Sequence, residues 1–202
     1  MKEKFLNSSI NFIKKNKKKK YTKEEIEIIL YGLESLYLVI TKAVIIFLIA
    51  FLLGIGKEVI LVLIFYNILR SQAFGIHASK SSYCLISSIT LFIGGAILTK
   101  FITIPYYISL TLSIICNILI IIYAPADTHK RPLINKKKRK LFKYKSIIIS
   151  ILYLLTIILF NKYKFVDYLI IGMINATIMI LPITYKIFGL PYNNYKTYKE
   201  VG

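Results

Sequence analysis

Long apolar blocks alternate with short polar segments along this chain of 202 residues. Apolar blocks separated by basic segments are typical of membrane helices joined by loops. Six such blocks follow residue 35. They are Leu36–Leu53, Val59–Leu69, Tyr83–Leu98, Ile102–Ala124, Ser146–Phe160 and Tyr168–Ile183. The pattern predicts an all-α membrane protein with about six transmembrane helices, built as one domain over residues 1–202.

The blocks differ in length, and a full span needs roughly 20 residues. Only the first and fourth blocks come near that length. The others are shorter, although lysines and tyrosines at their ends can extend them toward the headgroups. Val59–Leu69 is expected to be half-buried or re-entrant. The first helix is expected to begin near Thr22, because Thr22 followed by Glu24 and Glu25 is typical of a helix start.

The N-terminal region predicts a different kind of helix. Leu6, Ile10 and Ile13 share one face of residues 3–15, which favours an amphipathic helix lying on the cytosolic membrane surface. Lys14–Lys20 then carries six lysines in seven residues. A cleavable signal peptide is not expected, since the apolar stretch is short and interrupted by polar residues.

The positive charges are distributed unevenly between the two sides of this layout. The chain has 28 Lys and Arg against 9 Asp and Glu. With the N-terminus inside, 23 of the 28 fall in cytosolic segments. Four fall outside: Lys57, Lys100, Lys162 and Lys164. Cytosolic loops carry the excess of Lys and Arg in membrane proteins, so both termini are predicted to be cytosolic.

The residues with candidate chemistry lie in the first cytosolic segment. It runs from Arg70 to Cys84 and reads R-S-Q-A-F-G-I-H-A-S-K-S-S-Y-C. Gly75 is a natural helix end, and Ser81 or Ser82 a natural N-cap for the next helix. Cys84 would then be the second or third helical residue. The unpaired N–H groups there favour a thiolate and can bind an oxyanion.

His77 lies seven residues before Cys84 and could act as its base and later as an acid. On one straight helix, residues seven apart are separated by about 10 Å along the axis. The pair therefore requires a break in the helix, which we expect at residues 79–82. The alternative is that Cys84 only packs, on a small-residue stripe with Ser88, Gly95 and Thr99.

Two motifs resemble those of the accessory gene regulator B family, membrane peptidases of Gram-positive quorum-sensing systems. The first places Gly75, His77 and Cys84 after Arg70. The second reads Tyr-Ala-Pro-Ala-Asp-Thr from residue 123 and is followed by basic residues and Pro132. The resemblance covers nearly the whole chain. Phe74 departs from it, because many relatives have a small residue or His there.

The resemblance implies a cysteine endopeptidase in the cell membrane of a low-GC Gram-positive bacterium. In that family the enzyme removes the C-terminal tail of a small precursor peptide through a thioester, and a Cys or Ser within the peptide then closes a thiolactone or lactone. Cys84 is the implied nucleophile and His77 the implied base. The precursor has an amphipathic N-terminal region and an acidic tail. A homodimer is expected, and no cofactor or metal.

Three other residues near this segment have two interpretations each. Arg70 could grip an acidic side chain of the precursor or anchor its helix at the interface. Asp127 could orient His77, but a cap on the turn after the fourth block is favoured. Glu34 is an alternative acid, or an interfacial charge.

A basic loop between the fourth and fifth blocks is a candidate binding surface. Lys136, Lys137, Lys138, Arg139 and Lys140 are consecutive. Such runs beside membrane helices normally face anionic lipid, and this one could also attract the acidic tail of the precursor. Nucleic acid is not an expected partner.

Two other function classes compete with the peptidase. A peptide transporter or exporter would place charges or broken helices at mid-membrane, and only Lys42 and Pro105 hint at this. A membrane scaffold would make His77 and Cys84 replaceable. Cys116 is expected to be a packing residue, and His129 an exposed bystander.

Overall fold

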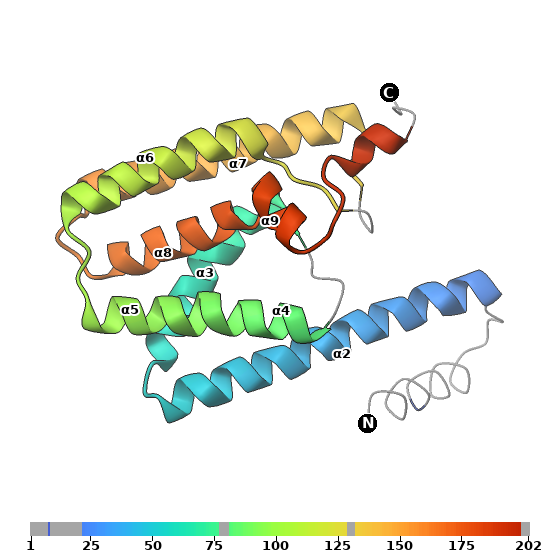
Figure 1. Cartoon of the computed structure of the whole chain (residues 1–202), viewed down its shortest axis with the longest axis horizontal. Coiled ribbons are helices and arrows are strands. Elements are labelled where there is room, and N and C mark those ends of the chain that lie inside the picture. Colours follow the sequence, from blue (N-terminus) through green and yellow to red (C-terminus); the bar gives the residue numbers. More distant parts are fainter. Residues whose placement is uncertain (1–7, 9–21, 77–80, 129–131, 199–202) are drawn as a thin grey trace. The chain divides into compact units, whose positions relative to one another are not determined.

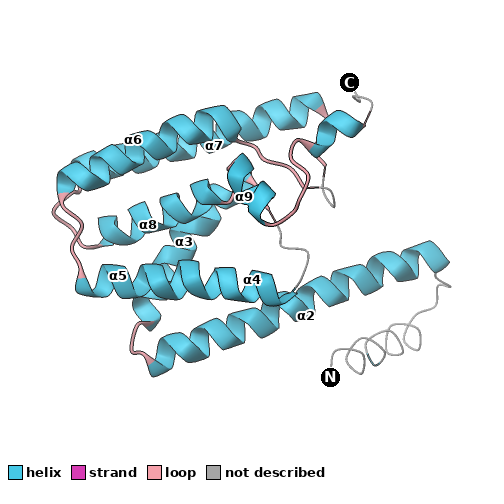
Figure 2. Ribbon diagram, viewed as in Figure 1, coloured by secondary structure: helices cyan, strands magenta, loops and turns pink. Residues whose placement is uncertain are grey.

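The computed structural model describes residue 8 and residues 22–76, 81–128 and 132–198. Tertiary contacts divide the chain into two compact units, residues 1–48 and 49–202. The amphipathic helix expected at residues 3–15 lies, apart from residue 8, outside the described residues. All named elements in the described part are helices, and pairing between extended segments there is limited to one bridge, Phe74 with Ala126. The all-α prediction is confirmed for this part of the chain (Figures 1 and 2).

Most of the first unit is the helix α2 (Lys23–Leu52), whose last residues belong to the second unit. Thr22 and Glu25 cap its start reciprocally. The Glu25 N–H donates to Thr22 Oγ1 at 3.2 Å, and the Thr22 N–H donates to Glu25 Oε2 at 2.9 Å. This capping box confirms the predicted helix start.

The second unit contains the remaining elements. They are α3 (Gly56–Ala73), α4 (Ser81–Ser88), the π-helical η1 (Ile89–Gly94), α5 (Gly95–Phe101), α6 (Tyr106–Tyr123), α7 (Lys136–Leu159), α8 (Phe165–Ile178), α9 (Pro182–Ile187) and the 3₁₀ turn η2 (Asn194–Thr197). The elements α4, η1 and α5 follow one another without a gap, so they form a single helical run (Figure 1).

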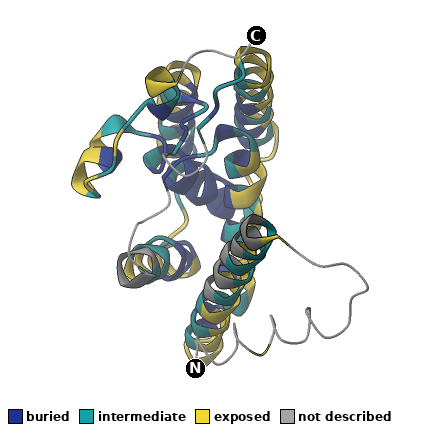
Figure 3. Ribbon diagram, turned by 90° about the vertical axis from the view of Figure 1, so that its right-hand side faces the viewer, coloured by how far each residue is buried: buried dark blue, intermediate teal, exposed yellow. Residues whose placement is uncertain are grey.

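The helix α8 is the core of this unit. It packs against α3, α5, α6 and α7, and nearly all of its residues are buried (Figure 3). Gly172 lets it approach α3 closely. A Cβ at this position would lie 2.8 Å from Phe65 Cβ and 2.9 Å from the Tyr66 backbone nitrogen. Small residues commonly permit such contacts between membrane helices.

The helices α6 and α7 have inverted polarity: their polar residues face the protein interior and their apolar residues face outward. Small and polar residues of α6 face inward, including Ser109, Ser113 and Asn117, and Ser146 and Ser150 do so on α7. The outward faces are apolar. On α6 they include Ile108, Ile114, Ile115, Ile118, Ile121 and Ile122. Both helices are long and apolar enough to cross a membrane. The other apolar helices are shorter, so the six-span layout stays a prediction.

Several predicted boundaries were wrong, two of them because of prolines. The fourth helix was expected from Ile102, but α6 begins at Tyr106, because residues 102–105 are extended and Pro105 lies just before the first turn. The sixth was expected to run to Ile183, but α8 ends at Ile178 and a separate α9 begins at Pro182. A proline inside a helix would remove a backbone hydrogen bond.

Two other predicted ends were also wrong. The second block was expected to give a short helix over Val59–Leu69, but α3 has 18 residues and ends at Ala73. The residues Lys136–Lys140 were expected in a loop, but they form the first turns of α7. The Asn135 side chain accepts a hydrogen bond from the Lys138 N–H at 2.9 Å, which caps the helix one residue before the lysines.

Candidate active site

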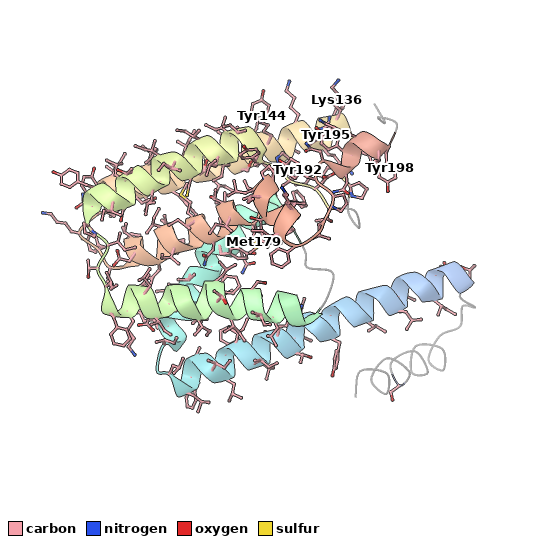
Figure 4. The ribbon with its side chains drawn as sticks, in the orientation of Figure 1. Lys136, Tyr144, Met179, Tyr192, Tyr195 and Tyr198 are labelled. Atoms are coloured by element: carbon pink, nitrogen blue, oxygen red, sulfur yellow. The ribbon has the colours of Figure 1, made fainter. Side chains whose placement is uncertain are left out.

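The chain turns sharply after α3, immediately before His77. Phe74 and Gly75 both have positive φ, 59° and 117°. Three backbone hydrogen bonds fix the turn. The Gly75 N–H donates to Ala126 O at 2.9 Å, the Ala126 N–H to Ala73 O at 3.0 Å, and the Ile76 N–H to Met179 O at 3.0 Å. The end of α3 is thereby joined to the segment after α6 and to the end of α8, where Met179 lies (Figure 4).

Only glycine fits at position 75. A Cβ there would lie 2.6 Å from the Met179 carbonyl oxygen, inside van der Waals contact. The φ of 117° is also a conformation that residues with a side chain rarely adopt. Phe74 takes a positive φ without this freedom, and its ring packs edge-on against Phe142 at 4.8 Å. The prediction that Gly75 ends the second helix is confirmed: α3 ends at Ala73, Phe74 is its C-cap, and Gly75 follows as the terminating glycine.

Arg70 holds the same turn from inside. Its Nη2 donates to the carbonyl oxygen of Ile76, the residue before His77. The guanidinium also lies over the Tyr66 ring, 5.4 Å from its centroid. Its Nη1 is buried and has no hydrogen-bond partner among the described residues. Arg70 therefore stabilises the turn, a role that neither sequence interpretation included.

The helix carrying Cys84 is separate from α3. The chain is not helical at Gly75 and Ile76, and α4 begins at Ser81, so Cys84 is the fourth residue of a new helix. No single helix joins residues 75 and 84, as a catalytic pair of His77 and Cys84 requires. The break was expected at residues 79–82 and Cys84 at the second or third helical position, but Ser81 and Ser82 are helical and Cys84 is therefore the fourth residue. His77 and the side chain of Cys84 lie outside the described part of the structure.

Both carboxylate oxygens of Asp127 accept hydrogen bonds from backbone N–H groups. Oδ1 accepts from the Asn194 N–H at 2.9 Å, and Oδ2 accepts from Tyr195 at 2.7 Å and Leu133 at 3.3 Å. The side chain is 3% exposed. None of these donors lies in the turn after α6, so the bonds do not form the local cap that was favoured; Asp127 instead joins the C-terminal segment to the connection before α7. Glu34, the alternative acid, is on α2, and its side chain lies outside the described residues.

Two tyrosines complete this junction. The Tyr185 hydroxyl donates to the Asp127 backbone oxygen at 2.8 Å. Burial, and then the nearby Asp127 carboxylate, raise the pKa of Tyr185, so the hydroxyl remains a donor at neutral pH. Tyr192 packs edge-on against Tyr185 at 5.0 Å. Burial, followed by its neighbours Tyr123, Tyr195 and Asp127, raises the pKa of Tyr192 to about 12.

The basic residues at the start of α7 lie beside the C-terminal segment. Arg139 stacks on the Tyr195 ring, 3.8 Å from its centroid, and donates to Leu133 O at 3.4 Å. Tyr195 thus lies next to the first turns of α7, near Lys136 (Figure 4). Lys137 and Lys138 are exposed. Arg139 is therefore engaged within the protein, whereas these two lysines face outward.

Sequence reasoning missed Met179, Tyr185 and Asn194, because each acts through backbone or hydroxyl groups on segments distant in sequence. Cys116 is buried on α6, as a packing residue should be. His129 lies outside the described residues. Among the residues that the structure describes, no three His, Cys, Asp or Glu side chains are close enough to hold a metal ion.

Comparisons with known proteins agree with the motifs. The sequence model of the accessory gene regulator B family matches residues 6–180. An AgrB-like protein of Clostridium acetobutylicum is 34% identical over 84% of this chain and 81% of its own length. The accessory gene regulator protein B of Staphylococcus aureus is 36% identical over 77% of this chain and 82% of its own length.

An AgrB-like protein of Listeria innocua is 30% identical over 84% of this chain and 83% of its own length. No solved structure matches. The family match covers both the turn at Gly75 and the junction at Asp127, and it agrees with the resemblance seen in the motifs. The chain belongs to the accessory gene regulator B family.

Proposed function

We propose that this protein is a membrane cysteine endopeptidase that matures a small quorum-sensing peptide, with Cys84 as nucleophile and His77 as base. The observation that carries the proposal is the break between α3 and α4. It leaves Cys84 near the start of a helix, and it places the Gly75 turn directly before His77 in the chain. Unpaired N–H groups at a helix start stabilise a thiolate.

The reaction proceeds by acyl transfer. His77 accepts the thiol proton, and the Cys84 sulfur attacks the scissile carbonyl carbon of the precursor. The N–H groups at the start of α4 stabilise the oxyanion that forms. The intermediate then collapses to a thioester, and His77 returns the proton to the leaving amine of the tail. A Cys or Ser within the peptide attacks the thioester, which releases Cys84 and closes the thiolactone or lactone.

The protein lies in the cell membrane in this proposal. The inverted polarity of α6 and α7 supports it, because a soluble protein would not turn apolar faces outward and serines inward. In this proposal the site is sunk below the membrane surface, which limits access of water and favours cyclisation over hydrolysis of the thioester. The similar proteins come from Clostridium, Staphylococcus and Listeria, which are Gram-positive genera.

The first turns of α7 recognise the acidic tail of the precursor, anionic lipid headgroups, or both. Lys137 and Lys138 are exposed there, and they belong to the same end of the protein as the Gly75 turn. The link runs through Asp127, which binds Leu133 just before α7 and follows Ala126, the partner of Gly75.

The test is co-expression with a candidate precursor, encoded beside this gene and having a Cys or Ser core and an acidic tail. Mass spectrometry of the peptide is compared for the wild type, Cys84→Ala, His77→Ala and Cys116→Ala. We expect the wild type and Cys116→Ala to shorten the peptide and the other two to leave it whole. Cleavage by Cys84→Ala would exclude the proposed nucleophile. Export of uncleaved peptide by all four would favour a transporter.

A further inference from the structure

The helical run that carries Cys84 is interrupted by a π-helical segment. The run extends from Ser81 to Phe101, and residues 89–94 in its middle form η1. A π-helical turn accommodates one more residue than an α-helical turn, and such segments are rare and concentrate at functional sites. Its persistence requires partners for backbone groups that the regular α-helical ladder would have satisfied.

Asn175 on α8 anchors this turn from outside the run, at a carbonyl that also accepts from the Gly95 N–H. Its Nδ2 donates to the carbonyl oxygen of Leu91, inside η1, at 2.9 Å. Asn175 is 5% exposed and lies on the largely apolar helix α8. Burying an amide in such surroundings is unfavourable unless it is hydrogen-bonded. The bond is therefore a strong link between the core helix and the π-helical turn.

The π segment and α5 fix this run to the core, whereas α4 extends beyond them. Phe92 and Ile93 of η1 are buried, and the Phe92 ring packs edge-on against Tyr66 at 4.8 Å. At Gly95 a Cβ would lie 2.6 Å from Ile171 Cγ2, so the backbone of the run approaches α8 closely. The conformation of η1 thus determines how α4 is rotated relative to the core.

We infer that Asn175 is a positioning residue for Cys84: by holding the π-helical turn at Leu91, it sets the direction in which α4 presents the nucleophile. The inference rests on the proposed function for the role of Cys84. If η1 became regular α-helix, residue 84 would turn by about 100° and move by about 1.5 Å. Displacements of about 1 Å at a reacting group can lower a rate by two orders of magnitude.

The experiment combines Asn175→Leu with deletion of Thr90, an exposed residue of η1. Asn175→Leu removes the donor and lets η1 relax to α-helix, which rotates α4. Deleting Thr90 removes the extra residue, so a regular helix then leaves α4 in its original direction. The double variant should therefore recover what Asn175→Leu loses. The deletion alone should remain close to wild type.

Two readouts are measured in a Cys116→Ala background: cleavage of the candidate precursor, and the rate at which a maleimide alkylates Cys84. We expect Asn175→Leu to lower cleavage by about tenfold or more and to change the alkylation rate. The double variant should return both toward the Cys116→Ala values. Asn117→Leu is the matched control, because Asn117 is equally buried but bonds within its own helix.

Unchanged readouts in Asn175→Leu would overturn the inference, as would a folded double variant that recovers neither. If Asn175→Leu does not fold, Asn175→Ala is measured with the same deletion. The alkylation readout separates this inference from the proposed function. A protein that never cleaves the precursor, but whose Cys84 reactivity follows the expected pattern, would refute the peptidase and retain the positioning role.

Discussion

Gly75 is the residue on which the turn before His77 most depends. We expect Gly75→Ala to reduce precursor cleavage by about tenfold or more, because the new Cβ would collide with the Met179 carbonyl and the φ of 117° would be strained. Gly56→Ala is the control, since a Cβ at Gly56 meets nothing within 4 Å. Cleavage rates are measured by mass spectrometry, and helix content by circular dichroism. Normal cleavage by Gly75→Ala would contradict the importance of this turn.

Asp127 binds the C-terminal segment through charge-assisted bonds to the Asn194 and Tyr195 N–H groups. We expect Asp127→Asn to speed hydrogen exchange at these two amides by at least about tenfold, because an amide cannot accept on both sides. Tyr185→Phe should have a smaller effect, since it removes one neutral bond to the backbone of residue 127. Unaltered exchange in Asp127→Asn would mean that other contacts hold the segment.

The residue types of the site were predictable, but their partners were not. Gly75 near a helix end and Cys84 near a helix start followed from local preferences. The hydrogen bonds that Arg70 and Asp127 make within the protein did not follow from local preferences. Arg70 binds a carbonyl that only the turn exposes, and Asp127 binds amides 67 and 68 residues away. Such pairings depend on tertiary structure, which residue spacing does not encode.

At the scale of elements, α7 begins under electrostatic strain. Five basic residues occupy its first five positions, where the helix dipole favours negative charge. The Asn135 cap offsets part of this cost, and an acidic ligand would offset more. The lysine-rich sequence indicated a loop. The residue that starts the helix, Asn135, lies one position before the basic run, and its role as a cap was not recognised.

We expect Lys137→Gln with Lys138→Gln to slow cleavage of a precursor with an acidic tail by about threefold to tenfold at low salt, with a smaller effect at high salt. Lys162→Gln is the matched control, because Lys162 lies just beyond the opposite end of α7. Cleavage rates are compared for acidic and neutral tails. An equal loss for both tails would contradict tail recognition and favour a lipid-binding role.

Helices were predicted better than their ends. Apolar runs identified every major helix of the described part, since hydrophobicity is a property of the whole run. The ends depended on single residues such as Pro105 and Pro182. The separation of α8 from α9 matters for the site, because the Met179 carbonyl that binds Ile76 lies between them. The π-helical turn in the third helix had no sequence signal that we recognised.

At the scale of the whole second unit, the two ends of the helices differ in how many basic residues they carry. Lys100 donates to Gly54 O, and Lys164 to Ile102 O and the Asp167 carboxylate, so the connections at one end lie together. The Gly75 turn, Asp127 and the basic start of α7 lie at the other. This segregation agrees with the charge asymmetry of the sequence and supports the proposed orientation.

That orientation predicts which positions a membrane-impermeant maleimide can label in intact cells. In a background of Cys84→Ala and Cys116→Ala, Lys162→Cys should be labelled from outside. Lys138→Cys should be labelled only after the cells are permeabilised. Labelling of Lys138→Cys but not Lys162→Cys in intact cells would show that the topology is inverted, and the site would then face away from a cytosolic precursor.

The central claim is that the precursor becomes covalently attached to Cys84, and intact-protein mass spectrometry tests it most directly. The precursor used has its ring-closing Cys or Ser replaced by Ala, so that the thioester cannot cyclise and accumulates. The account predicts an added mass equal to the acyl fragment on wild type and Cys116→Ala. Hydroxylamine should remove it, and Cys84→Ala should show none. An adduct that persists in Cys84→Ala, or tail release by the wild type without any adduct, would contradict the account.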